Sequence, residues 1–394
     1  GEIPFSSGGG TLELPRPTAV ALREYVPGNL IYANGQKFVP RQFMLAAGME
    51  IDEKPSFLVD KEKGSVKETA PSADPASGEE TVLKTISVCD VELAHQTQIS
   101  DEEENRWQMP VMVYAIEKDR HNGGISYLWG NDAKLDFRRN VYFCMVNAGA
   151  KNSKADAPLG YPVCTICGQS VSPMSSDAQL KSFMERHTER CGKTPERIGF
   201  YADIIADAFM LPDRQNPKIA YSVMEAIRMG AVHVLDMHLQ DLQVMAIPHF
   251  DDDKVDAYLY DPMPGGSGLL TQIIEKFQQV YESAVSFLEN CSSGCETSCI
   301  NCMQNYRNSF YHKYLDRHEA LEFLYDHGDS LKFGHEIPPI GNTSSLTVPL
   351  GEPANKAEQR LQVMLKKAGF MDGEWQKQIK FKHKLNCKFG STTP

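Results

Sequence analysis

Four cysteines stand within twelve residues of this chain, with the spacing C-x3-C-x3-C-x2-C: Cys291, Cys295, Cys299 and Cys302. A polar loop of this length, which also contains Gly294, can direct its sulfurs at one tetrahedral ion at about 2.3 Å each. Four thiolates carry four negative charges, so a cation or oxidation must hold them together. Zinc is the predicted ion, and two disulfides or an iron–sulfur cluster are the alternatives. A four-cysteine zinc site leaves no position for water, so we expect it to organise structure and not to catalyse.

A second set of metal-type residues has the spacing C-x2-C-x19-H-x3-C: Cys164, Cys167, His187 and Cys191. A C-x2-C turn followed by a glycine, here Gly168, is typical of a zinc half-site. His187 and Cys191 are four residues apart, so they share one face of the helix predicted for 178–190. Zinc is predicted here as well, which makes two structural zinc sites. The alternative is a redox-active C-x2-C with an ordinary surface histidine, but such a motif needs a βαβ context that the preceding residues lack.

The elements that must position these sites predict an α+β fold. Short β-type runs indicate an antiparallel sheet, at 81–88, 111–116, 125–129, 141–146 and 197–211. Asn34-Gly35 lies between two short apolar runs and predicts a hairpin, and both halves of this region, 16–29 and 30–39, are expected to be strands. Apolar residues with a period near 3.6 predict helices at 218–230 and 270–288, and a further helix is expected at 318–325.

Composition divides the chain into six expected segments. They are a linker or arm at 1–16, a β-rich accessory domain at 17–157, a CCHC zinc-knuckle insertion at 158–215, a helix-rich four-cysteine zinc domain at 216–334, a linker at 335–354 and a truncated α/β piece at 355–394. Residues 52–82 are dominated by Asp, Glu, Lys, Pro, Ser and Ala, so we expect a mobile insertion. A solvated loop is the simpler interpretation of this insertion, and a partner-binding segment is the alternative.

Charge limits how the chain could meet nucleic acid. The 394 residues carry a net charge of −12, so DNA contact requires a local basic patch. Arg307, Lys313 and Arg317 supply such a patch, with His312 as a phosphate contact, a ligand or a hydrogen-bonded structural residue. The Gly265-Gly266 turn before a helix could hold a DNA phosphate, and a tight turn for close packing is the alternative.

Several signals are missing from the sequence. It contains no apolar run of eighteen residues, no signal-peptide pattern and no G-x4-G-K-[ST] phosphate loop. We therefore expect a cytoplasmic fragment with no membrane partner and no nucleotide site of its own. Because the first residue is Gly1 and not Met, its true N-terminus is expected upstream.

A series of motifs resembles one known family. Arg23–Gly35 contains Arg-Glu-Tyr-x-Pro-Gly-Asn and Asn-Gly, Tyr260–Gly268 reads Tyr-Asp-x-x-Pro-Gly-Gly-x-Gly, and Asn308, His312 and Leu-Asp-Arg at 315–317 follow the four cysteines. Together with the C-x2-C-Gly turn, this order resembles the MrfA-type zinc-binding domain, formerly of unknown function, found C-terminal to superfamily-two DNA helicases. The likeness covers roughly residues 16–330. Members of the family act in DNA repair, and related proteins occur in antiphage systems such as DISARM and Druantia.

The C-terminal piece is similar to a second family. A helix with Glu358, then Gly369-Phe370, a strand at Gln376–Phe381 and Thr393-Pro394 resemble the beginning of very-short-patch-repair-like nucleases of the PD-(D/E)xK type. The likeness implies that Glu358 is a remnant of a nuclease metal site. The catalytic Asp and the later Glu and Lys are absent from this sequence, so we expect no nuclease activity from it.

These resemblances predict a function. The chain is expected to be the zinc-stabilised accessory region of a superfamily-two helicase or helicase–nuclease in antiphage defence. Its implied partners are single- or double-stranded DNA, a helicase motor in cis or as a separate subunit, and other defence subunits. An accessory domain of a DNA-repair helicase is one alternative. A protein-interaction scaffold without DNA binding is another, and the acidity favours it. An independent metalloenzyme would need an open metal site, which neither cysteine set offers.

Overall fold

A computed structural model of the chain describes residues 2–4, 11–16, 18–45, 51, 54–75, 80–99, 109–151, 157–263 and 265–340. The side chain of Arg307 and the predicted nuclease-like piece at 355–394, with Glu358, lie outside the described residues. Residues 1–339 form one compact unit. The expected boundaries at 157 and 215 both fall inside this unit, and a single sheet runs across them.

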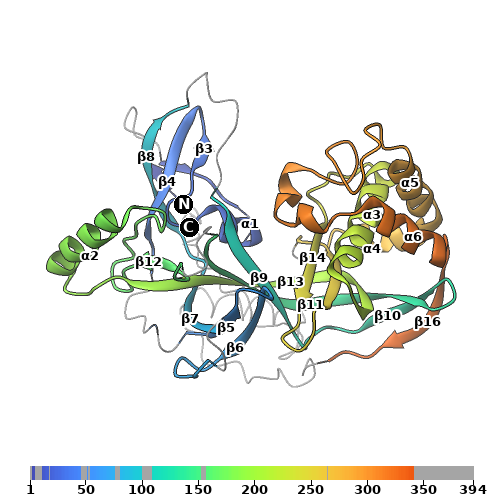
Figure 1. The fold of residues 1–394 in the computed structure, drawn as a ribbon, viewed down its shortest axis with the longest axis horizontal. Coiled ribbons are helices and arrows are strands. Elements are labelled where there is room, and N and C mark those ends of the chain that lie inside the picture. The colour runs from blue at the N-terminus through green and yellow to red at the C-terminus, as the bar shows by residue number, and fades with distance from the viewer. Residues whose placement is uncertain are drawn as a thin grey trace, which may run out of the picture. The chain divides into compact units, whose positions relative to one another are not determined.

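Two long antiparallel strands, β11 (Ala133–Ala150) and β13 (Glu196–Gln215), form the centre of the largest sheet (Figure 1). Asp136 pairs with Met210 at one end of this ladder and Asn147 pairs with Phe200 at the other. The register shifts between Arg138 and Val141, next to Asn140, whose φ is 50°. A bulge of this kind bends and twists a long strand pair locally.

The two ends of the ladder carry different neighbours. Beside the Asp136 end lie β10 (Gly124–Trp129), β16 (Leu331–Ile337), β15 (Val255–Tyr260) and β14 (Gln243–Pro248). Beside the Asn147 end lie β9 (Val111–Lys118), β12 (Tyr161–Val163) and, parallel to β13, β7 (Glu80–Ser87), which continues the sheet to β5 (Ser56–Asp60) and β6 (Ser65–Thr69). The prediction of a β-rich, mainly antiparallel N-terminal part is confirmed.

A smaller three-stranded sheet contains the predicted hairpin. Its order is β3 (Ile31–Ala33), β4 (Gln36–Phe43) and β8 (Val91–Gln98), and β1 (Glu2–Pro4) pairs separately with β2 (Thr11–Glu13). Asn34 and Gly35 connect β3 to β4 with φ values of 48° and 72°. Positive φ at both central residues is what a two-residue hairpin turn requires.

Two expectations for the N-terminal part are wrong. The stretch 16–29, expected as a strand, contains a helix, α1 (Thr18–Glu24), because its buried Ala21, Leu22 and Tyr25 have helical spacing. The expected mobile insertion at 52–82 contains β5, β6 and the start of β7 instead of an open loop. There Phe57 and Val59 are fully buried, so this polar-looking stretch has apolar side chains to hide.

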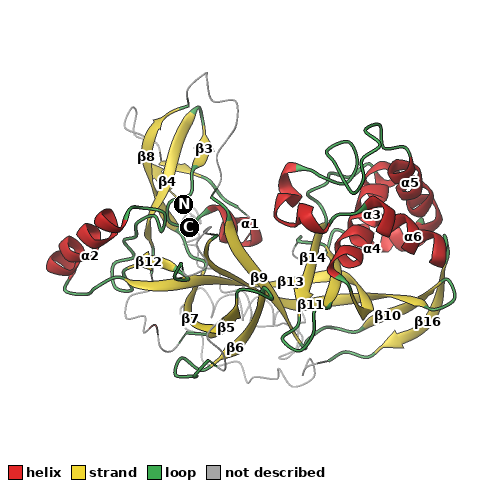
Figure 2. Ribbon diagram, in the orientation of Figure 1, coloured by secondary structure: helices red, strands yellow, loops and turns green. Residues whose placement is uncertain are grey.

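The helices gather mainly at one end of the sheet (Figure 2). At that end lie α3 (Pro217–Leu235), α4 (Leu269–Glu275), α5 (Phe277–Glu289), the 3-10 segment η2 (Tyr306–Tyr314) and α6 (Arg317–His327). The helix α2 (Asp177–Cys191) lies apart from them, at the opposite end of the sheet (Figure 2). The apolar face of α3 packs on β14 and β15, and α5 and α6 pack on α3. The helix expected at 270–288 is broken at Lys276 into α4 and α5. Among the described helices, none has the length and apolar character that crossing a bilayer requires.

Trp129 connects the sheet to the helices and supplies a stability test. Its side chain is fully buried, its ring centroid lies 5.2 Å from that of Phe277 and 5.3 Å from that of Phe323, and its Nε1–H donates to the carbonyl of Gly328 at 2.7 Å. We expect Trp129→Ala to lower the free energy of unfolding by about 3–5 kcal/mol, because it leaves a large cavity. Urea unfolding followed by circular dichroism measures this.

The adjacent residue provides the control for this substitution. Leu128 is 42% exposed, so Leu128→Ala should change the free energy of unfolding by no more than about 0.5 kcal/mol. Equal effects of the two substitutions would contradict the assignment of Trp129 to the core.

Candidate metal centres

The four-cysteine loop begins where α5 ends and leads into η2. Sγ–Sγ distances are 3.7 Å for Cys291–Cys295, 3.6 Å for Cys291–Cys299, 3.6 Å for Cys295–Cys302 and 3.8 Å for Cys299–Cys302. Sulfurs at about 2.3 Å from one tetrahedral ion are about 3.8 Å apart, so the loop has the dimensions of a single-ion site. A disulfide requires about 2.05 Å between the sulfurs. A multi-iron cluster distributes its thiolates over several metal ions and so holds them farther apart than one ion does.

Backbone N–H groups donate to the sulfurs of this loop and so favour the thiolates that bind a cation. The N–H of Cys299 donates to Cys302 Sγ at 3.1 Å, and Gly294 turns the chain with φ 53°. Backbone N–H groups of Cys295 and Ser293 lower the pKa of Cys291 to about 6 against the effect of burial, whereas burial raises the pKa of Cys302 to about 12. Because zinc binds thiolates, metal binding must release the protons of the thiols that burial keeps neutral.

Arg317, predicted as a phosphate contact, binds the back of this loop. Its Nε donates to the carbonyl of Cys295 at 3.0 Å and its Nη1 to the carbonyl of Leu288 at 2.9 Å. Its backbone N–H donates to the carbonyl of Thr297 at 2.8 Å. The half-buried guanidinium thus joins the end of α5, the cysteine loop and the start of α6. These contacts are structural.

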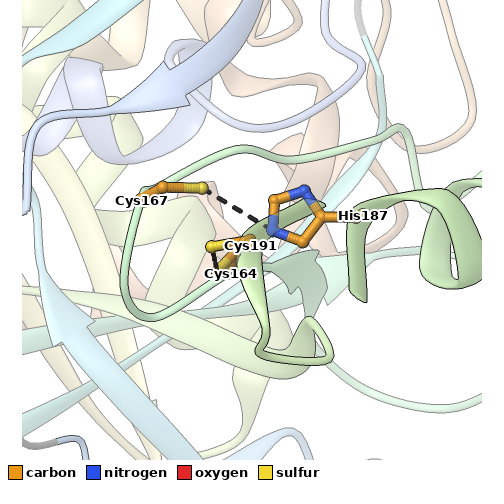
Figure 3. Close-up of side chains that lie close together, drawn as sticks. All are labelled: Cys164, Cys167, His187 and Cys191. Atoms are coloured by element: carbon orange, nitrogen blue, oxygen red, sulfur yellow. Dashed lines mark hydrogen bonds between the residues drawn. The ribbon is translucent and has the colours of Figure 1, made fainter. Parts of the chain in front are cut away.

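The second donor set combines a turn and a helix (Figure 3). Cys164 Sγ lies 3.8 Å from Cys191 Sγ, and Cys167 Sγ lies 3.6 Å from His187 Nε2. One ligand atom from each of the four residues falls within 4.8 Å of all the others. The helix that supplies His187 and Cys191 begins with a capping box, between Ser176 and Gln179. Three sulfurs and one imidazole nitrogen at these distances fit a closed tetrahedral zinc site.

A glutamine that the sequence analysis did not single out orients the histidine. Gln169 Oε1 lies 3.1 Å from His187 Nδ1. If Nδ1 carries the proton and donates to Gln169, the Nε2 lone pair faces the thiols, which is the usual arrangement around a ligating histidine. The only sequence signal was its position directly after the C-x2-C-Gly turn.

The turn itself is attached to β4. Gly168 has φ 73°, and a Cβ added to it would lie 1.8 Å from the carbonyl oxygen of Phe43. The backbone N–H of Phe43 donates to the carbonyl of Gly168 at 2.9 Å. A glycine is therefore required here both for the backbone angle and for this close approach.

The remaining predicted residues lie around η2 and before α4. Lys313 is exposed, with Nζ 4.5 Å from the ring centroid of Tyr314. His312 Nε2 lies 3.0 Å from the carbonyl oxygen of Asn305 and 2.6 Å from Asn308 Oδ1. This favours the hydrogen-bonded structural role among the three considered for His312.

The Gly265-Gly266 turn is wrapped around a carboxylate. Asp261, which is 1% exposed, accepts hydrogen bonds from the N–H of Met263 at 3.0 Å and from the N–H and hydroxyl of Ser267, both at 2.5 Å. The donors on either side of the two glycines are thus directed at an anion of the protein itself, and the N–H of Gly266 donates to the carbonyl of Met263. A phosphate would be repelled by Asp261, and the geometry favours the tight-turn alternative.

A buried polar network was missed by the sequence analysis. Glu225 is fully buried on α3 and accepts hydrogen bonds from Arg228 at 2.5 Å, Asn308 at 3.0 Å and Tyr311 at 3.0 Å. It fastens η2 to α3. Two charges three residues apart within an otherwise apolar helix were the available signal, because such charges are buried only when they are paired.

Each of the two donor sets has four ligands and no open position, and each is held by the sheet or by helices. This is the arrangement of protein regions in which zinc stabilises the fold and does not catalyse. Residues 223–303 match the family model of the MrfA Zn-binding domain. This match includes all four cysteines of the loop, and the family resemblance drawn from the motifs is confirmed for these residues. The Cys164–Cys191 site lies outside the matched residues.

Known proteins were compared over longer stretches. The Druantia protein DruE of Escherichia coli (strain UMEA 4076-1) is 24% identical over 195 residues, which cover 42% of this chain and 10% of that protein. A crystal structure of the DUF1998 helicase MrfA bound to DNA matches 79% of this chain and 31% of its own, with 10% identity and a TM-score of 0.35. A second, with AMPPNP, matches with 11% identity and a TM-score of 0.29. The chain spans a tenth of the length of the curated relative it matches.

The contacts of Arg317 lead to a test. We expect Arg317→Ala to accelerate zinc loss to a chelator, because the carbonyl of Cys295 in the loop and that of Leu288 at the end of α5 lose charge-assisted donors worth about 1.5–3 kcal/mol each. Arg317→Lys keeps the charge but not the two-pronged geometry, so it should also lose zinc faster than the wild type. Zinc release is followed with a colorimetric chelator. If both variants release zinc at the wild-type rate and only Arg317→Ala binds DNA more weakly, the structural role is wrong and Arg317 is a phosphate contact.

Proposed function

We propose that this chain is the zinc-stabilised accessory region of a superfamily-two DNA helicase or helicase–nuclease that acts in antiphage defence. In this proposal zinc shapes the region, which contacts DNA beside the motor and binds partner subunits. The chemistry of ATP hydrolysis, and of any nuclease, belongs to other parts of the system. The main support is that the residues matching the MrfA Zn-binding domain hold four sulfurs at the S–S distances expected around one tetrahedral ion.

The defence setting is supported by the likeness to a Druantia protein. An accessory role in a DNA-repair helicase uses the same zinc geometry and differs in its setting. The proposed motor lies in cis or on a separate subunit in the prokaryotic cytoplasm.

DNA contact is supported by the charges around η2. Lys313 is exposed there, and Lys218 on α3 is also exposed, with its Nζ 3.9 Å from Asp316. The backbone of Arg307 belongs to the same segment. This concentration of basic residues contrasts with the net charge of −12 for the whole chain.

A protein-interaction scaffold without DNA contact is the second candidate. The acidity of the chain favours it, as do the structural contacts of Arg317 and the carboxylate inside the Gly265-Gly266 turn. Both candidates require the zinc sites, so metal content does not separate them. DNA binding does.

Metal content tests the two-site proposal. We expect two zinc ions per chain, because both donor sets are complete and closed. Cys167→Ser should lower the ratio by one ion by removing a ligand of the CCHC site, and Cys295→Ser should do the same at the four-cysteine loop. Elemental analysis by mass spectrometry measures zinc and iron together. Cys89→Ser, outside both sets, should leave the ratio unchanged. A wild-type protein with one zinc ion, or with iron, would contradict the proposal.

Salt-dependent DNA binding tests whether the basic residues of η2 contact DNA. We expect Lys313→Ala and Arg307→Ala each to weaken binding and to reduce the slope of log K against log salt by about 0.7 on a single strand or 0.9 on a duplex, which is the loss of one phosphate contact. Fluorescence anisotropy with labelled strands gives both quantities. Lys181→Ala on α2 removes the same charge from a side chain that is 78% exposed and should have no effect. If the wild type binds neither DNA form while it captures the helicase motor in a pull-down, the scaffold candidate is correct.

A further inference from the structure

Aromatic rings and cations contact one another in a row that begins between α1 and η2. Arg23 Cζ lies 4.3 Å from the ring centroid of Phe310, and the ring of Phe310 meets that of Tyr311 edge-on at 4.7 Å. Phe310 remains 48% exposed. The guanidinium covers one part of this ring while almost half of the side chain stays open to solvent.

The row continues beneath the surface, through stacked tyrosines of which Tyr311 is buried, to the exposed Lys313. Tyr221 on α3 stacks on Tyr311 at 4.4 Å with an interplanar angle of 18°, and on Tyr314 at 5.5 Å with an angle of 8°. Lys313 Nζ in turn lies 4.5 Å from the ring centroid of Tyr314. Cations therefore stand at both ends of a row of rings, and each contacts an aromatic face.

The nearby carboxylates are already bound to other groups. Glu24 pairs with Arg16 at 3.1 Å, Asp316 caps α6 through the N–H of His318, and Glu225 is buried with Arg228. The row thus combines local positive charge with a half-exposed aromatic ring. Buried structural rings do not need this exposure, and a protein-binding apolar patch does not need the cations.

We infer that this row is a stacking site for single-stranded DNA, in which a base lies on Phe310 and phosphates approach Lys313 and Arg23. The inference rests on the proposed function and adds the form of DNA and the residue that contacts a base. Base stacking on an aromatic side chain does not depend on sequence and needs an unpaired base, because the bases of a duplex already stack on one another. Cations beside the ring supply the phosphate contacts and a cation–π contribution.

The test compares three labelled probes: an oligothymidine strand, the same strand with abasic sugars in place of nucleotides, and a duplex of equal length. We expect Phe310→Ala to weaken binding of oligothymidine by about tenfold, within the range for the loss of one stacked base. It should not change binding of the abasic strand or the duplex, which offer phosphates but no unstacked base. Phe310→Trp, which keeps a stacking surface, should retain wild-type affinity for oligothymidine.

A matched control uses the same residue type elsewhere. Phe333 on β16 is 63% exposed, so Phe333→Ala should leave all three affinities unchanged. Thermal unfolding and zinc content of each variant show that the fold is retained. Equal weakening of all three probes by Phe310→Ala, or no weakening at all, would overturn the stacking site while leaving DNA contact intact. Failure of the wild type to bind any probe would instead overturn the proposed function.

Discussion

Repulsion among four closely placed sulfurs is the constraint on which the helical part depends. Two thiolates about 3.7 Å apart repel each other by about 4.5 kcal/mol at an effective dielectric constant of 20. A divalent cation at their centre lies closer to each sulfur than the sulfurs lie to one another and carries twice their charge, so attraction exceeds this repulsion. The loop can then act as a fixed point to which Arg317 joins the end of α5 and the start of α6.

Local patterns were sufficient for the parts of the fold that depend on short spacing. The two sets of clustered metal-type residues, the Asn34-Gly35 turn and α2 were all predictable, because each is defined by a few residues close in sequence or by a single helical face. The α1 helix was not, since seven residues are too few for periodicity to outweigh a nearby hairpin signal. The β5–β6 hairpin was hidden because its core side chains Phe57 and Val59 stand among charged residues.

Contacts between distant residues were beyond the reach of the sequence alone. No spacing rule relates Asn308 to Glu225, or Arg23 to Phe310, because the backbone must fold before these side chains meet. For the same reason, the sequence alone could not show which groups the charged and glycine-rich motifs contact. Arg317 and the Gly265-Gly266 turn matched the chemistry of phosphate binding, and the structure places protein groups against both. A basic or glycine-rich motif defines what a segment can bind, and the fold decides which partner it meets.

The long strand β13 has a mechanical consequence. It begins a few residues after Cys191, runs for 20 residues and ends at the N-cap of α3, the helix that η2 is fastened to. At about 3.3 Å per residue it spans about 60 Å. A pull along this strand loads the hydrogen bonds to β11 in shear, so that many of them share the force at once and none opens first. A displacement of either end of β13 along its axis would therefore be transmitted through these hydrogen bonds toward the cysteine-rich centre at the other end.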